Sequence, residues 1–242
     1  MSLWITAGSM RRLSLLPACG LVLLAGSPRS QPIERTGRIT GAVELATDLV
    51  ARRPAFRLYN NYGPGAIRDP RQQTTNRSPA VVYLEGAPST HAPATRRVMV
   101  EQIDERFSPH VVAVLQGTTI EFPNRDPYFH NVFSLSRTKS FDLGRYAQGE
   151  AASITLNTPG VIQVYCQIHS DMSGYILVLE NAFFTVVGES GEFLIDNVPS
   201  GEYQLVAWHA RTTPIRKRVR VVNGETIHLD FVLPLDSSSD GT

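Results

Sequence analysis

Short apolar runs follow one another along the chain from Thr36 onward, separated by Gly, Pro, Asn and Asp. No segment sustains the 3.6-residue period of an amphipathic helix, and runs of this kind are typical of strands. The predicted strands are 38–45, 80–84, 111–115, 119–122, 152–156, 161–166, 174–179, 192–195, 203–208, 216–222 and 226–233, and another begins in 129–133. Spacings of about ten residues between such strands predict an all-β protein built from sandwiches.

Two polar stretches interrupt this pattern. Residues 60–79 are rich in Asn and Arg and contain Gly63-Pro64-Gly65, which predicts a long loop. Residues 236–242 have no apolar run and predict a disordered tail.

The N-terminus has the pattern of an export signal. Arg11 and Arg12 precede an apolar run over residues 13–25, and small residues follow it. We therefore expect a signal peptide over residues 1–27 and a periplasmic or secreted protein of the bacterial type. The natural start is either Met1 or Met10, which directly precedes the arginine pair.

Composition and charge exclude several classes of protein. The chain is 42% hydrophobic and 19% charged, which is too apolar for a disordered chain. No stretch approaches the roughly 20 apolar residues of a membrane span. The 23 basic and 22 acidic residues give a net charge of +1, so no strong positive field attracts nucleic acid. We expect no membrane span and no nucleic-acid partner.

The chain has two cysteines, Cys19 and Cys166, and we expect only Cys166 to remain in the mature protein. Cys19 lies in the predicted signal, where Pro17 disfavours a lipid attachment site, so the mature chain keeps Cys166 alone. A lone thiol in an exported protein is buried, reactive, paired with another chain or bound to metal.

The residues after Cys166 favour the metal. Cys166, His169 and Met172 place a thiolate, an imidazole and a thioether within seven residues after a predicted strand, and His130 begins another strand upstream. Two His, one Cys and a weak axial Met suit copper in electron transfer. Zinc accepts His and Cys but has little use for a thioether, so Met172 favours copper.

Simpler interpretations exist for each of these residues. A single Cys, His or Met is usually part of a core or a surface. A cysteine protease would pair the thiol with a histidine distant in sequence, whereas His169 is three residues from Cys166. No catalytic residues are therefore predicted, and we expect no enzyme activity.

Residues 97–180 resemble the cupredoxins, the type 1 blue copper proteins, and the ligand loop is similar to that of amicyanin. The region is also similar to plastocyanin-like proteins labelled as methylamine utilisation proteins. The matching segments are Phe122-Pro123-Asn124-Arg125-Asp126, His130-Asn131-Val132-Phe133 and 160–166, followed by His169 and Met172. The resemblance implies a Greek-key β-sandwich with one copper per chain.

The same resemblance implies roles for individual residues. His130, Cys166 and His169 would be the equatorial copper ligands and Met172 the axial ligand. Asn131 would brace the ligand strands and hydrogen-bond near the sulfur. The edge of His169 would face solvent as the exit for the electron.

Residues 181–235 resemble the second half of a carboxypeptidase regulatory-like, or transthyretin-like, β-sandwich. About 55 residues are too few to close such a sandwich. The strands predicted near residues 40 and 82 are candidates for its first half. We hypothesise one discontinuous sandwich, residues 34–92 plus 181–235, with the copper domain inserted.

Three functions fit this organisation. The first is an exported one-electron carrier whose partner is another redox protein, such as a c-type cytochrome or a quinone-dependent dehydrogenase. The second is a copper-binding or copper-delivery protein. The third is a carbohydrate- or surface-binding module that carries a copper domain. Arg216, Arg218 and Arg220 lie on one face of a predicted strand, either as a docking stripe or as an ordinary solvated face.

Overall fold

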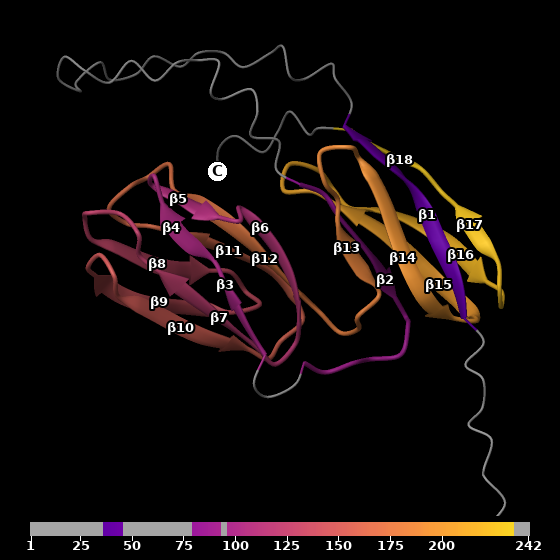
Figure 1. The fold of residues 1–242 in the computed structure, drawn as a ribbon, viewed down its shortest axis with the longest axis horizontal. Coiled ribbons are helices and arrows are strands. Elements are labelled where there is room, and N and C mark those ends of the chain that lie inside the picture. The colour runs from indigo at the N-terminus through magenta and orange to yellow at the C-terminus, as the bar shows by residue number, and fades with distance from the viewer. Residues whose placement is uncertain (1–35, 46–78, 93–95, 235–242) are drawn as a thin grey trace, which may run out of the picture. The chain divides into compact units, whose positions relative to one another are not determined.

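The computed structural model describes residues 36–45, 79–92 and 96–234. All regular elements in these residues are strands, and they form several sheets (Figure 1). The prediction of an all-β protein is confirmed. The predicted signal peptide (1–27), the predicted tail (236–242) and all but the last residue of the predicted loop (60–79) lie outside the described residues. The described part has no helix with the length and apolar character of a membrane span.

The strands from β3 to β12 surround one apolar core. Three of them pair in the order β10-β7-β3, five in the order β6-β12-β11-β8-β9, and β4 pairs with β5. Their bounds are β3 (Arg97–Met99), β4 (Glu101–Ile103), β5 (Arg106–Ser108), β6 (Val111–Leu115), β7 (Thr118–Pro123), β8 (His130–Leu135), β9 (Ser140–Tyr146), β10 (Ala151–Leu156), β11 (Gly160–Tyr165) and β12 (Ser173–Leu179). Alternate side chains point inward, so Ile162 and Val164 of β11 are buried between more exposed neighbours.

The pairing of three of these strands brings the predicted metal ligands to one end of a sheet. β11 and β12 are antiparallel, with Tyr165 opposite Ser173, so residues 166–172 form the loop that joins them. β8 contacts β11 through the pair Phe133 and Tyr165. The beginning of β8 therefore lies beside the end of β11, where Cys166 follows.

The remaining strands form two four-stranded sheets. In the first sheet, β1 (Thr36–Leu45) pairs with β14 (Glu192–Pro199), β17 (Thr226–His228) and β18 (Phe231–Leu233). The second follows the order β13-β2-β15-β16, with β13 (Phe184–Val186), β2 (Val81–Glu85), β15 (Gly201–Trp208) and β16 (Ile215–Val221). One core cluster draws on both sheets, including Ile39, Leu84 and Leu205.

Strands that precede residues 97–180 thus pair with strands that follow them. Gly41 of β1 lies opposite Phe193 of β14, and Leu84 of β2 lies opposite Leu205 of β15. The hypothesis of a discontinuous sandwich requires pairing of this kind. The domain boundaries themselves stay a prediction.

β12 is covered on both faces, because a third apolar cluster packs against its second face. Four consecutive residues of that strand, 176–179, are buried, as expected of a strand covered on both faces. Ile176 and Val178 belong to the core of the β3 to β12 group. Leu177 and Leu179 pack instead in a cluster with Val81 and Trp208.

The predicted strand 226–233 is two strands, β17 and β18, separated by Leu229 and Asp230. The break has a local cause, because the Asp230 carboxylate accepts a hydrogen bond from the Ala42 amide at 2.8 Å. On β16, the arginines at positions 216, 218 and 220 are exposed and alternate with less exposed residues, and the Arg216 guanidinium donates two hydrogen bonds to Glu85.

A substitution at Gly41 tests whether β1 packs against the strands that follow residue 180. A Cβ atom at Gly41 would lie 1.9 Å from the backbone oxygen of Leu229 and 2.9 Å from the Phe193 ring. Because backbone cannot move aside cheaply, we expect Gly41→Ala to lower the free energy of unfolding by roughly 3 kcal/mol in urea titrations of the full chain. Gly188→Ala is the matched control, since no heavy atom lies within 4 Å of its Cβ position. Equal stability of the two variants would contradict this packing.

Candidate metal centre

The ligand loop folds back on itself between β11 and β12. Cys166 directly follows β11, and Met172 directly precedes β12. The Cys166 amide donates to the carbonyl oxygen of Met172 at 3.2 Å, and the Met172 amide donates to that of His169 at 3.0 Å. These two hydrogen bonds close the loop and hold His169 beside the Cys166 side chain.

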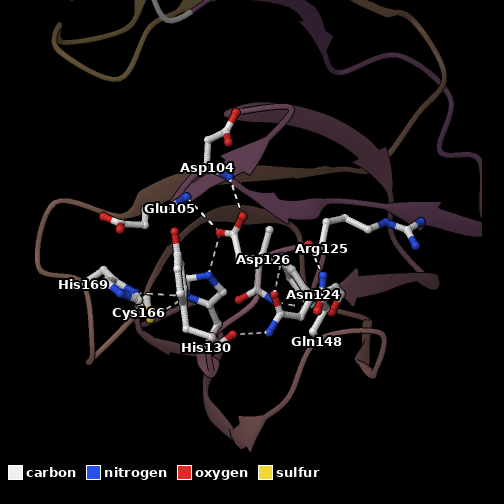
Figure 2. A network of polar contacts seen from close by, with 12 residues as sticks. Asp104, Glu105, Asn124, Arg125, Asp126, His130, Gln148, Cys166 and His169 are labelled. Atoms are coloured by element: carbon white, nitrogen blue, oxygen red, sulfur yellow. Dashed lines mark hydrogen bonds and ion pairs between the residues drawn. The ribbon is translucent and has the colours of Figure 1, made fainter. Parts of the chain in front are cut away.

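Three of the four predicted ligands bring their donor atoms together. Figure 2 shows Cys166 and His169 close to the ring of His130. The Cys166 Sγ atom lies 3.7 Å from His130 Nδ1 and 3.9 Å from His169 Nδ1, and the two nitrogens are 3.1 Å apart. Within the described residues, this trio forms a group whose donor atoms all lie within 4.8 Å of one another.

The spacing of these atoms fits a trigonal metal ion. Bond lengths of about 2.1 Å to nitrogen and about 2.3 Å to sulfur, as zinc makes, place trigonal donor atoms about 3.6–3.8 Å apart. The two sulfur–nitrogen separations, 3.7 and 3.9 Å, lie close to that range, and the nitrogen–nitrogen separation of 3.1 Å is shorter. Met172 is only 1% exposed and belongs to the same core cluster as Cys166, so its side chain is buried in the apolar core that also holds the thiol.

Burial differs sharply within this set of side chains. His130 is 0% exposed and Cys166 is 3% exposed, whereas His169 is only partly buried. The site therefore meets solvent along one imidazole. Among the described residues, Cys166 is the free cysteine, so its thiol is available as a ligand.

Asp126 orients the buried imidazole, a role that the sequence did not predict. Its Oδ2 atom lies 2.8 Å from His130 Nε2 (Figure 2). A carboxylate at this nitrogen favours a proton on Nε2, which leaves the lone pair of Nδ1 directed toward Cys166 and His169. The contact thus selects the tautomer that a metal ligand needs.

Backbone amides hold Asp126 in turn. Its carboxylate accepts hydrogen bonds from the amides of Asp104 at 2.8 Å and Glu105 at 2.9 Å, in the turn between β4 and β5 (Figure 2). Burial opposes ionisation of Asp126, but these amides and His130 outweigh it and hold the pKa of the carboxyl below its usual value. Asp126 is therefore an ionised acceptor at neutral pH.

Asn131 connects β8 with the ligand loop. Its Oδ1 atom accepts a hydrogen bond of 2.7 Å from the amide of Gln167, the residue that follows Cys166. Its Nδ2 atom lies 3.5 Å from the Asp142 carboxylate of β9. Asn131 is 1% exposed, so these contacts fix the start of the loop from inside the fold.

A buried polar pair also lies in this core. Gln102 is 0% exposed, and its Nε2 atom donates to the Tyr146 hydroxyl at 2.5 Å. The Tyr146 hydroxyl donates to the carbonyl oxygen of Phe122 at 2.9 Å. Tyr146 belongs to the same core cluster as Cys166 and Met172, so the core that holds these two residues also contains a phenol, which is hydrogen-bonded to the Gln102 amide.

Comparison with known proteins finds solved structures that are similar to part of the chain. No family model matches the chain, and no curated protein matches it. Similar solved structures include a reduced amicyanin variant, at 18% identity over 40% of this chain and 98% of amicyanin, with a TM-score of 0.32. A purple cupredoxin from Nitrosopumilus maritimus matches at 21% identity over 35% of this chain and 99% of its own, with a TM-score of 0.31. A copper-containing nitrite reductase from Thermus scotoductus matches at 28% identity, over 40% of this chain but 24% of its own, with a TM-score of 0.34.

Proposed function

We propose that residues 97–180 are a cupredoxin domain that binds one copper ion and carries single electrons. The observation that supports this most strongly is the convergence of the His130 and His169 Nδ1 atoms on the Sγ atom of Cys166. In this proposal those three side chains are the equatorial ligands, and Met172 is the axial ligand.

The donor set matches the demands of an electron carrier. Bound copper would supply one redox couple, Cu(II)/Cu(I). The soft sulfur atoms of Cys166 and Met172 suit the reduced ion, and the imidazoles of His130 and His169 suit the oxidised ion. Asp126 and Asn131 hold ligand segments from the protein side, so the site keeps one geometry and little rearrangement accompanies electron transfer.

The surface around His169 suits a brief encounter with another protein. Ile168, its neighbour in the chain, is 41% exposed, and Tyr128, whose ring packs on the His169 ring, is 44% exposed. A small apolar surface of this kind favours a transient interface. We propose that the partner is another exported redox protein, such as a c-type cytochrome or a quinone-dependent dehydrogenase, met in the periplasm or outside the cell.

Electron carriage predicts a reversible one-electron titration. We expect the copper-loaded protein to be oxidised and reduced with a Nernst slope of one electron and to exchange electrons rapidly with a soluble c-type cytochrome in stopped-flow absorption. The same chain loaded with zinc is the control, because zinc has no redox couple. Copper that transfers to an acceptor apoprotein without redox exchange would favour delivery instead.

A further inference from the structure

The Tyr128 ring lies against the part of the metal centre that meets solvent. Of the four proposed ligands, three are at most 3% exposed, and only His169 is partly exposed. The Tyr128 ring lies 5.7 Å from the His169 ring and 5.8 Å from the His130 ring, measured between centroids. The two imidazoles are themselves 4.7 Å apart. One phenol ring therefore packs against both imidazoles.

Hydrogen bonds of the Asn124 side chain hold the backbone of the loop that carries Tyr128. The Asn124 side chain, 0% exposed, donates to the carbonyl oxygen of Tyr128 at 2.8 Å. Its Oδ1 atom accepts from the Asp126 amide at 3.0 Å. A single buried amide thus holds two points of the segment between β7 and β8, and Figure 2 shows Asn124 next to Asp126. The ring position follows from this anchored backbone.

The neighbouring aromatic residue shows that this arrangement is particular to Tyr128. Phe129 is next in the chain and is more exposed, at 57% against 44%. Within the described residues, its ring makes no aromatic contact with either imidazole. An exposed aromatic side chain in this loop therefore does not have to pack on the histidines. The contact of the Tyr128 ring with both imidazoles is a specific feature of that residue.

We infer that Tyr128 shields the metal centre, excluding small anions from the copper and holding His169 against release of the ion. This inference rests on the proposed copper site. A small ligand from solvent has to approach past the partly exposed imidazole, because the other ligand side chains are buried. Aromatic pairs are individually weak, but the Tyr128 ring packs on the His169 ring at a tilted angle and edge-to-face on the His130 ring. In this inference it therefore restricts the imidazole of His169 and occupies the approach.

The test compares Tyr128→Ala with Tyr128→Phe and with the matched control Phe129→Ala. Azide is added to each Cu(II)-loaded protein, and the visible spectrum is recorded. Copper release to a chelator is timed by the loss of the same absorption. In the metal-free proteins, proton NMR of the His169 ring reports the ring-current shift from Tyr128, so one measurement does not depend on copper.

We expect azide to change the spectrum of Tyr128→Ala only, and copper to leave that variant about tenfold faster than the wild type. Tyr128→Phe keeps the ring and should behave as the wild type does, as should Phe129→Ala. The His169 resonances should shift in metal-free Tyr128→Ala and not in Phe129→Ala.

Two results overturn the inference while leaving the copper site intact. One is a Tyr128→Ala protein with wild-type azide response and copper release. The other is a wild-type protein that already binds azide. A wild type that takes up no copper would overturn the proposed function, and this inference with it.

Discussion

Replacing Cys166 with serine is expected to abolish the intense visible absorption of the copper-loaded protein. That absorption arises from charge transfer between a thiolate and Cu(II), and a serine hydroxyl offers neither a soft donor nor a thiolate. The variant keeps nearly the same side-chain volume at a position only 3% exposed, so the fold should survive and the loss should be specific. Absorption spectra recorded with one equivalent of Cu(II) measure it.

The chain provides its own control for this experiment. Cys19→Ser removes the other cysteine of the sequence, which lies in the predicted signal peptide. That variant should keep the full absorption. A Cys166→Ser protein that is as intensely coloured as the wild type would show that the colour, and therefore the copper, belongs to another site.

The second large effect is expected for Asp126→Asn. The substitution removes the charge that the His130 Nε2–H and the amides of Asp104 and Glu105 share. An amide side chain keeps one acceptor oxygen but leaves buried donors short of partners, which costs about 2–4 kcal/mol of folding free energy. Because the imidazole of His130 also loses its orientation, we expect copper affinity to fall roughly 10–100-fold.

Chelator competition and denaturation of the metal-free protein measure these two losses separately. Asp196→Asn is the control, because Asp196 is a hydrogen-bonded carboxylate whose partner, Arg38, lies on the surface of the other strand group. Asp196→Asn should leave the copper affinity unchanged. It should alter the free energy of unfolding by no more than about 0.5 kcal/mol. Wild-type copper affinity in Asp126→Asn would contradict the orienting role of the carboxylate.

The parts of this fold that were predictable are those encoded by local pattern. Runs such as 111–115 form strands with the predicted bounds because β-branched residues and flanking turns act over a few residues. β9 (Ser140–Tyr146) escaped prediction although Phe141 and Leu143 alternate with polar residues, and so did β3, β4, β5 and β13, which have three residues each. Strands this short have no readable period. Pairing with another strand defines them, at long range when Arg97 aligns with Thr119 of β7, and locally in the hairpin of β4 and β5.

The candidate site divides in the same way. The spacing of Cys166, His169 and Met172 is local, so these candidate ligands could be predicted from the sequence. The structure brings Cys166 and His169 together with His130. Asp126 is only four residues before His130, but its support of His130 was not readable, because the amides that hold its carboxylate in place belong to a turn more than 20 residues away in the chain. The same holds for Gln102, whose partner Tyr146 is 44 residues distant. Contacts of this range depend on the assembled sheets rather than on any motif.

Titration of the purified chain with Cu(II) tests the copper site most directly. We predict one intense visible band that grows linearly and stops at one copper per chain, is bleached by a one-electron reductant and returns on oxidation. A protein that stays colourless in Cu(II), or that binds copper with only the weak absorption of nitrogen and oxygen ligands, would contradict the site formed by His130, Cys166, His169 and Met172.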